Sequence, residues 1–391
     1  MKTTQIKFFI LSAFGLAVLS GCNNGKTVDS VTSQSASDAC TSTALSNRYV
    51  VQWEDGSYSI EQGSSLADFK KTFVEKKLAL IKHVDQDHRI QLKIQNTNDV
   101  QTLSEGPMNW GPEKIEAPAV WSQGYRGENV LVGVIDGMVD ATHAQLAANI
   151  SSVQQFNSEK NDPVKNKHGS HVAGIIAADA DPTHGPITGV APRAKIVGGQ
   201  FIANDGGGSL GDAIVAMNSV AARGAKIINM SWGGAPCVQN LKSAVDQLSA
   251  RGIILVTAAG NDYLNSDYSP SYPAAFNALN QINVAATAID DFMSNFSNHG
   301  YRTVNIAAPG VGIFSTIPGN QIESLDGTSM AAPMISGVAA LLLSARPLAT
   351  AQQIKYAILN SVDIGSGVIQ VSSHGRVNAR RALLELQRIL P

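Results

Sequence analysis

Residues 326–333 read Asp-Gly-Thr-Ser-Met-Ala-Ala-Pro and open a run of small and apolar residues that continues to Ala345. A serine at the amino end of such a helix has an exposed hydroxyl, and its own N–H points, with the helix dipole, toward developing negative charge. We therefore predict that a buried helix starts at Thr328 and that Ser329 is a candidate nucleophile.

Three further segments set a polar side chain at the end of an apolar run. Residues 132–136 read Val-Gly-Val-Ile-Asp, residues 166–174 read Asn-Lys-His-Gly-Ser-His-Val-Ala-Gly, and residues 254–261 read Ile-Leu-Val-Thr-Ala-Ala-Gly-Asn. A serine hydroxyl needs a base such as His168 to take its proton, and the base needs a carboxylate such as Asp136 to orient it. The Asn261 amide would supply a hydrogen bond to the oxyanion of an acyl-transfer intermediate.

Apolar strands alternate with helical stretches from about residue 105 to the end, which predicts an α/β fold with a parallel sheet covered on both faces. The expected strands are 130–135, 195–202, 226–230, 253–257 and 282–286. The expected helices are 169–178, 208–222, 238–250, 328–345, 350–359 and 377–389. In such sheets the working site lies at the carboxyl ends of the strands.

In their order, these four motifs resemble those of the subtilisin-like serine proteases (subtilases, peptidase S8), and the likeness covers residues 107–387. Residues 115–124, 228–234 and 307–310 agree with it. The resemblance implies a three-layer subtilisin-like fold with a mostly parallel central sheet over residues 105–391. It also implies a serine endopeptidase with Asp136, His168 and Ser329 as its triad and Asn261 in its oxyanion hole.

The same resemblance assigns the nucleophile to Ser329 rather than Ser336 and the base to His168 rather than His171. It implies two segments that sandwich an extended peptide substrate, and a primary pocket with small walls. The residues concerned are Gly206, Gly207 and Gly208 on one side, Ser231, Trp232 and Gly233 on the other, and Ala258, Ala259 and Gly260 at the pocket. Trp232, Leu210 and Ile202 would line an apolar pocket upstream of the cut, so we expect broad specificity with a preference for apolar residues.

Three other interpretations of these residues compete with this one. His168 and His171 have the spacing of metal ligands, but no third ligand follows at a matching spacing. Residues 206–211 fit a dinucleotide-binding glycine pattern, yet Ser231 stands where a ribose-binding carboxylate is expected. Gly137 and Met138 follow Asp136 where the family has a hydroxyl residue and a glycine, so a catalytically impaired, peptide-binding relic is the alternative function.

The first 104 residues carry export and regulatory signals. Residues 1–21 have a basic start and a short apolar run, which is typical of a signal peptide. The Leu-Ser-Gly-Cys ending resembles a bacterial lipobox, which implies lipidation of Cys22 and anchoring in the cell envelope. Residues 22–47 are rich in serine and threonine and predict a tether, and residues 48–104 form a small α+β unit similar to the family's inhibitory prodomain.

The other two cysteines, Cys40 and Cys237, allow a single intrachain disulfide in an oxidising compartment. Cleavage near residues 101–108 would separate the catalytic domain from its lipid anchor. A disulfide between these cysteines would keep the two parts together after that cut.

Composition excludes several classes of protein. The chain has 391 residues, 44% hydrophobic and 15% charged, with a net charge of −2, so it lacks the basic surface that nucleic-acid binding requires. We expect a monomer that acts on peptides or proteins and needs no cofactor for catalysis. Structural calcium is an open alternative, because Gln145 stands where the family has a carboxylate ligand and residues 179–181 precede a longer loop.

Overall fold

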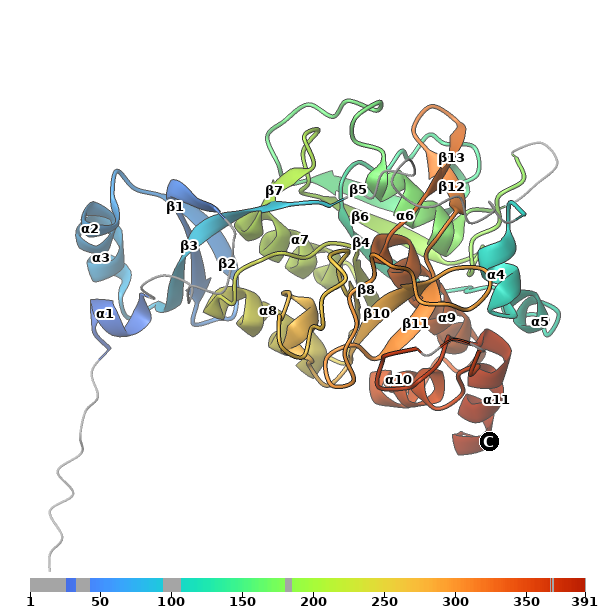
Figure 1. The fold of residues 1–391 in the computed structure, drawn as a ribbon. Helices are drawn as coiled ribbons and strands as arrows, with labels where there is room; N and C mark the ends of the chain where they lie inside the picture. Colours follow the sequence, from blue (N-terminus) through green and yellow to red (C-terminus); the bar gives the residue numbers. More distant parts are fainter. Residues whose placement is uncertain are drawn as a thin grey trace, which may run out of the picture.

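Two units lie side by side in the computed structural model, which describes residues 26–32, 43–93, 107–179, 185–365, 367 and 369–390. The small N-terminal unit comprises the described residues up to 93, and the large domain comprises those from 107 onward (Figure 1). The signal peptide expected over residues 1–21 lies outside the described residues.

The large domain is built on a seven-stranded sheet in which every neighbouring pair of strands is parallel. Its order is β11 (Ile306–Pro309), β10 (Gln281–Thr287), β9 (Ile254–Ala258), β8 (Ile227–Met230), β4 (Leu131–Asp136), β6 (Lys195–Gln200) and β5 (Ile150–Gln155). A hairpin of β12 (Ile313–Ile317) and β13 (Gln321–Leu325) and the short strand β7 (Gly207–Ser209) lie outside this sheet.

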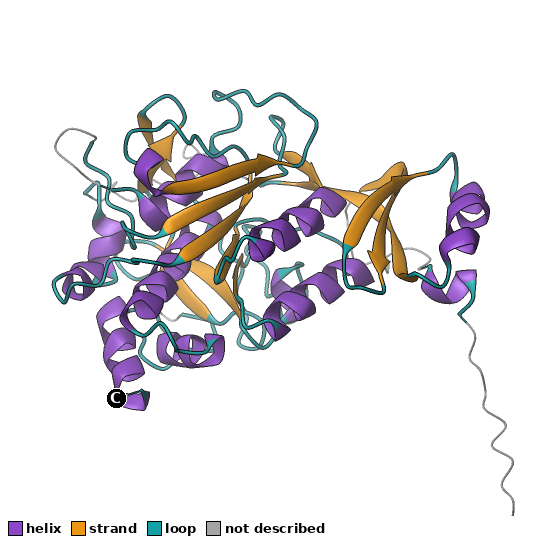
Figure 2. Ribbon diagram, turned by 180° about the vertical axis from the view of Figure 1, so that it is seen from behind, coloured by secondary structure: helices purple, strands orange, loops and turns teal. Residues whose placement is uncertain are grey.

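Successive side chains of each strand point to opposite faces of the sheet, so each face has its own apolar surface. Helices cover both of these surfaces. In β4, Val132 and Val134 join one core cluster, whereas Ile135 joins the other. The first cluster contains α4 (Trp110–Lys114), α5 (Ala117–Trp121), α6 (His168–Ala177), α9 (Thr328–Ala345), α10 (Ala351–Leu359) and α11 (Ala379–Ile389). The second contains α7 (Leu210–Ala222) and α8 (Gln239–Ala250) (Figure 2).

The expected three-layer α/β fold is therefore confirmed, and each strand and helix predicted for the large domain is present within a few residues of its expected bounds. Among the described residues, α9 alone is long and apolar enough to cross a membrane, but 94% of that stretch is buried inside the domain. Two sheet strands were not predicted. β5 is a polar edge strand, and β11 has only four residues.

The N-terminal unit has a three-stranded antiparallel sheet and a helical layer of its own. Its strands are β1 (Thr43–Trp53), β2 (Tyr58–Gln62) and β3 (Ile81–Gln91), and its helical stretch joins α2 (Leu66–Phe69), a π-helical turn η1 (Lys70–Val74) and α3 (Glu75–Lys77). Tyr49 stacks on Phe69 with ring centroids 4.2 Å apart. This small core matches the α+β unit expected from the sequence.

Part of the expected tether is folded. Residues 28–31 form the short helix α1 (Val28–Val31), and Thr32 forms a parallel bridge with Val84 of β3. Val31 is 3% exposed and joins the core of the N-terminal unit. The expectation of a tether over residues 22–47 rested on the many hydroxyl residues, and it overlooked Val31, which this core buries, and Val28, which packs against it. In the large domain, two short 3₁₀ helices complete the elements, η2 (Ala147–Asn149) and η3 (Ala274–Phe276).

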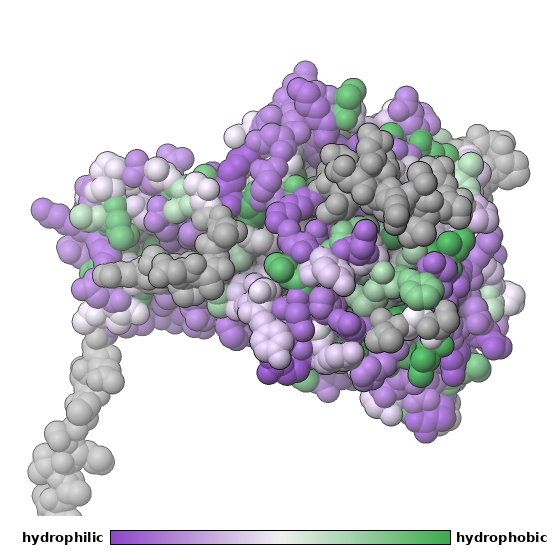
Figure 3. Space-filling view, in the orientation of Figure 1, coloured by the Kyte–Doolittle hydropathy of each residue, from purple (hydrophilic) through white to green (hydrophobic). Residues whose placement is uncertain are grey.

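The two units share one sheet. β3 extends from the N-terminal unit and pairs with β7 of the large domain, which gives the order β2-β1-β3-β7 (Figure 1). Hydrophilic residues cover most of the visible surface of both units, with apolar residues scattered among them (Figure 3).

Two carboxylates of β3 bind the amino ends of the two helices beneath it. Asp87 Oδ1 accepts a hydrogen bond of 2.9 Å from Gly211 N in the first turn of α7. Asp85 Oδ2 accepts one of 2.7 Å from Asn240 N in the first turn of α8, a helix whose own N-cap residue offers no side-chain bond. Helix amino ends carry unpaired N–H groups and partial positive charge, so these contacts stabilise the interface.

A partly buried charge cluster lies at the same contact. Arg48 of the N-terminal unit forms ion pairs of 2.6 Å with Asp87 and 2.5 Å with Asp212 of α7. Burial, the largest effect, raises the pKa of Asp212 to about 6, although Arg48 opposes the shift.

We predict that Asp212→Asn stabilises the protein at neutral pH. The raised pKa means that folded Asp212 keeps its proton up to about pH 6, while the unfolded chain loses it near pH 4, so ionising this carboxyl costs folding free energy. Wild-type stability therefore falls between about pH 4 and pH 6, by at most about 1.4 kcal/mol per pH unit. Urea unfolding from pH 4 to 7, in a Ser329→Ala background, should show an advantage of the variant that grows across this window. An advantage independent of pH would contradict the prediction.

Candidate active site

Asp136 and His168 come together at the carboxyl edge of the large sheet. Asp136 is the last residue of β4, and His168 is the first residue of α6. His168 Nδ1 lies 2.7 Å from Asp136 Oδ1, and both side chains are almost fully buried. The carboxylate is therefore placed to fix the ring and to balance its charge when Nε2 takes a proton.

The second oxygen of Asp136 is unsatisfied. Oδ1 also accepts a bond of 2.6 Å from Gly137 N, but Oδ2 is buried and has no hydrogen-bond partner among the described residues. A β-carbon at position 137 would overlap Asn166 Oδ1, which accepts a 2.9 Å bond from Met138 N. The absence of a hydroxyl after Asp136 thus leaves an unpaired oxygen, and the packing of Asn166 keeps position 137 a glycine.

Ser329 lies in the first turn of α9, a helix that packs against α6. Its hydroxyl donates a bond of 2.9 Å to Ser231 O, and the Ser231 hydroxyl donates one of 2.8 Å to Ser329 O. Because a serine has a single hydroxyl proton, the Ser329 hydroxyl must turn away from Ser231 O before it can donate to a base. In enzyme structures without a bound substrate, catalytic hydrogen bonds are often long or poorly aligned.

Asn261 has a fixed orientation. Its Oδ1 accepts two bonds from Thr328, 2.9 Å from the backbone N–H and 2.8 Å from the hydroxyl. A backbone N–H can only donate, so this atom is the oxygen and Nδ2 faces the other way. Nδ2 donates a bond of 3.0 Å to the carbonyl oxygen of Lys93, at the end of the N-terminal unit.

The three glycines of the cleft receive a peptide strand. Arg89 pairs with Ser209, Ile90 with Gly208 and Gln91 with Gly207, and Leu92 N donates a bond of 2.8 Å to Gly206 O. A β-carbon at Gly208 would lie 2.8 Å from the ring of Phe201 and 3.1 Å from its carbonyl oxygen, so the packing requires glycine at that position, whereas one at Gly207 would meet only the flexible end of the Arg89 side chain.

Ile90 enters the apolar pocket expected from the sequence. It is 2% exposed and belongs to the same core cluster as Ile202, Leu210 and Trp232. Trp232 packs edge-on against Phe201, with ring centroids 5.2 Å apart.

The remaining predicted cleft residues lie nearby. Among the described residues no backbone hydrogen bond joins residues 89–93 to the segment Ser231–Gly233, so the second side of the sandwich stays a prediction. Ala258 and Ala259 are buried and Gly260 is partly buried at the end of β9, directly before Asn261.

His171 takes no part in this arrangement. It is buried in α6 and its Nε2 lies 3.0 Å from Glu323 O. Burial lowers the pKa of His171 to about 3, which keeps the ring neutral. Across the described ranges, no group of three or more His, Cys, Asp or Glu residues is arranged to hold a metal ion.

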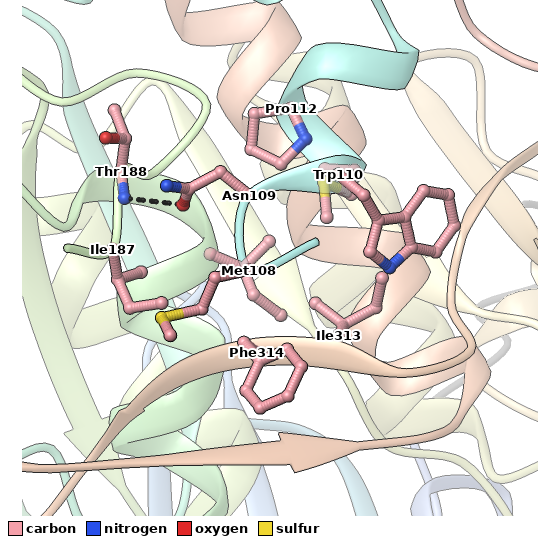
Figure 4. A pocket seen from close by; sticks show the side chains of 11 residues that line it. Met108, Asn109, Trp110, Pro112, Ile187, Thr188, Ile313 and Phe314 are labelled. Carbon is pink, nitrogen blue, oxygen red and sulfur yellow. Dashed lines mark hydrogen bonds between the residues drawn. The ribbon is translucent and has the colours of Figure 1, made fainter. Parts of the chain in front are cut away.

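The loop considered for calcium is held by side-chain amides. Gln145 Nε2 donates a 2.6 Å bond to Ile187 O, and Asn109 bonds both Pro186 O and Thr188 N (Figure 4). Gln145 Oε1 is buried without a partner, which makes one uncharged ligand rather than the six to eight oxygens that calcium takes. Residues 180–184 of this loop, including Asp181, lie outside the described residues, so structural calcium stays an open alternative.

One of the three cysteines lies within the described residues. Cys237 is exposed, immediately before the N-cap residue of α8. Cys22 and Cys40 lie outside the described residues.

Sequence reasoning missed Lys93, Asp262 and Thr328. Thr328 lay inside the motif already quoted, but its role depends on a contact with a residue 67 positions away. Lys93 Nζ lies 2.6 Å from Asp262 Oδ1. The sequence did carry a signal for Asp262, since it is a carboxylate that directly follows Asn261, the expected oxyanion donor.

Comparison with known proteins agrees with this geometry. The profile of the subtilase family matches residues 127–382. The chain belongs to the subtilase family. It is 37% identical over 275 residues to thermitase from Thermoactinomyces vulgaris, which covers 70% of this chain and 95% of thermitase. It is also 37% identical over 251 residues to subtilisin DY from Bacillus licheniformis, which covers 63% of this chain and 88% of that relative.

The major intracellular serine protease of Bacillus subtilis is a third subtilase relative, 37% identical over 258 residues, which covers 63% of this chain and 76% of that protease. These matches extend over the large domain, and they make peptides or proteins the expected substrates.

We predict that Thr328→Val lowers kcat by about tenfold, because one of the two bonds that hold Asn261 Oδ1 is lost and the donor Nδ2 becomes free to turn. KM for a peptide substrate should change little, since the effect is confined to the oxyanion. Thr328→Ser keeps the hydroxyl and is the matched control. Equal losses in both variants would show that packing rather than the hydrogen bond matters.

Proposed function

We propose that this subtilase is an exported serine endopeptidase made as a zymogen, with Asp136, His168 and Ser329 as its triad. Asn261 and the N–H of Ser329 form its oxyanion hole. The proposal is supported by the 2.7 Å contact between His168 and Asp136 and by the placement of Ser329 and Asn261 at the same edge of the sheet.

The mechanism uses these groups in turn. His168 removes the proton of Ser329 Oγ, which attacks the substrate carbonyl carbon and forms a tetrahedral oxyanion. Asn261 Nδ2 stabilises that oxygen, and His168 then gives its proton to the leaving amine. Water hydrolyses the resulting ester by the same route and restores the serine.

The hydrogen bond from Asn261 to Lys93 O is the observation that carries the proposal. A donor that already binds a peptide carbonyl oxygen at 3.0 Å is placed to bind the same oxygen as it gains charge. The adjacent residues extend along the glycine edge as a substrate would, by β-strand addition. The N-terminal unit is thus an intramolecular inhibitor, a prodomain whose last segment occupies the cleft.

The alternative is a catalytically impaired, peptide-binding relic. The unpaired Asp136 Oδ2 favours it, because a carboxylate held by fewer bonds orients His168 less firmly. We favour the enzyme, since the hydrogen bond between His168 and Asp136 is present.

A fluorophosphonate probe tests the proposed function. It should label the wild-type protein lacking residues 1–22, and it should not label Ser329→Ala or His168→Ala. Circular dichroism controls for folding. Failure to label a folded wild-type chain, together with peptide binding in the cleft, would contradict the enzyme and support the relic.

We further propose a monomer anchored to the bacterial envelope through lipidated Cys22, with a disulfide between Cys40 and Cys237. Lys26, the first described residue, lies only four positions after Cys22, so the folded prodomain begins within roughly 14 Å of the lipid. Cys237 is exposed next to α8, the helix that Asp85 caps.

Membrane fractions test this anchor. The processed catalytic part should stay with the membrane without reductant, and more of it should be released from Cys40→Ser than from the wild type. Cys22→Ser should make the whole protein soluble. A roughly 30 kDa fragment that is soluble without reductant in the wild type would overturn the disulfide.

A further inference from the structure

We propose that Asp262 makes this enzyme prefer a lysine or arginine immediately before the bond it cuts, and that the carbonyl of Lys93 is the first one it attacks. The inference rests on the proposed function. It adds the substrate class and the position of self-cleavage.

The register of the bound segment identifies the reacting carbonyl. The ladder from Arg89 to Leu92 runs antiparallel along residues 206–209 and ends one residue before Lys93. Asn261 Nδ2 then meets Lys93 O, and only one carbonyl of an extended chain can occupy the oxyanion donor. The cut therefore follows Lys93, upstream of the 101–108 region that the sequence suggested.

The Lys93 side chain meets an acidic group at the pocket. Its Nζ lies 2.6 Å from Asp262 Oδ1. Asp262 directly follows Asn261, and Asn298 Oδ1 fixes the local backbone through bonds of 3.0 Å from Asp262 N and 2.9 Å from Leu264 N. One short loop thus presents the oxyanion donor and a carboxylate to the same substrate residue.

This arrangement changes the expected specificity. Ile90 fills the apolar pocket three residues earlier, in agreement with the apolar preference expected from the sequence. The residue immediately before the cut, Lys93, is cationic rather than apolar. We therefore infer a substrate pattern with an aliphatic residue at the position of Ile90 and a basic one at the position of Lys93.

The strength of the preference for a basic residue depends on how exposed the two paired side chains are. The side chains of Lys93 and Asp262 are 65% and 37% exposed, and water and salt weaken a pair of this kind. We expect a graded selectivity that high salt reduces, rather than an absolute requirement.

Self-cleavage adds one water to the chain. Ser329 Oγ bonds to the Lys93 carbonyl carbon, and the bond from that carbon to the next nitrogen breaks as His168 protonates the amine. Water then attacks the ester carbon, one of its protons passes through His168 to Ser329 Oγ, and Lys93 leaves as a carboxylic acid that gives its proton to the solvent. No oxidant, metal or other reactant is needed.

Amino-terminal sequencing of the processed wild-type chain tests the position of the cut. The new terminus should read Ile-Gln-Asn, which starts at residue 94, and Ser329→Ala should remain whole. A first cut elsewhere in a chain that the fluorophosphonate labels would overturn the register and leave the proposed function standing.

Peptide kinetics test the selectivity. The substrates are acetyl-Ile-Gln-Leu-X p-nitroanilides. Asp262→Asn should lower kcat/KM for X = Lys, relative to kcat/KM for X = Leu, by about threefold. Relative to kcat/KM for X = Glu, the value for X = Lys should fall by about tenfold. Asp246→Asn, which removes another ion-paired surface carboxylate, 48% exposed, on α8, is the matched control. Unchanged ratios in an enzyme that still cuts these peptides would overturn the inference alone, whereas no cutting by the wild type would overturn the proposed function.

A charge swap tests the same contact inside the full chain. Lys93→Glu and Asp262→Lys should each slow processing, and the double variant should recover most of the rate. Additive slowing would mean that the two side chains do not act on each other.

Discussion

The pairing of β3 with β7 is the constraint on which the rest of the arrangement depends. A strand of the N-terminal unit becomes the edge partner of a glycine segment in the large domain, so the two units share one sheet. Backbone hydrogen bonds fix the register residue by residue. A slip of one residue would turn Ile90 out of its pocket and carry Lys93 O away from Asn261.

Polar contacts around this strand make the register specific. Asp85 and Asp87 each bind the amino end of one helix, and Arg48 joins Asp87 to Asp212. These bonds satisfy groups that would otherwise be exposed or unpaired, so the interface has polar anchors as well as an apolar core. Under the proposed function, the same bonds would hold a substrate-like segment in the cleft and couple the fold of the N-terminal unit to inhibition.

The sequence predicted the large domain well because its strands and helices are long and their apolar patterns are distinct. It also predicted Asp136, His168, Ser329 and Asn261 as site residues, since each follows or begins a buried element. It failed where function depends on contacts between distant segments. Thr328 orients Asn261 through a contact across 67 residues, and neither hydropathy nor local spacing predicts which residue of the prodomain reaches the cleft.

The folded residues 28–31 show the same limit. Two valines among hydroxyl residues carry too weak a pattern to predict a helix, yet Val31 is buried because the sheet offers a surface for it. In contrast, the missing hydroxyl after Asp136 was visible in the sequence, and the unpaired Oδ2 is its structural consequence.

A crystal structure of the full-length Ser329→Ala protein tests the central claim most directly, because the chain should remain uncut. The account predicts Lys93 O within hydrogen-bonding distance of Asn261 Nδ2, with Ile90 in the apolar pocket. An empty cleft, or a different residue at Asn261, would contradict it.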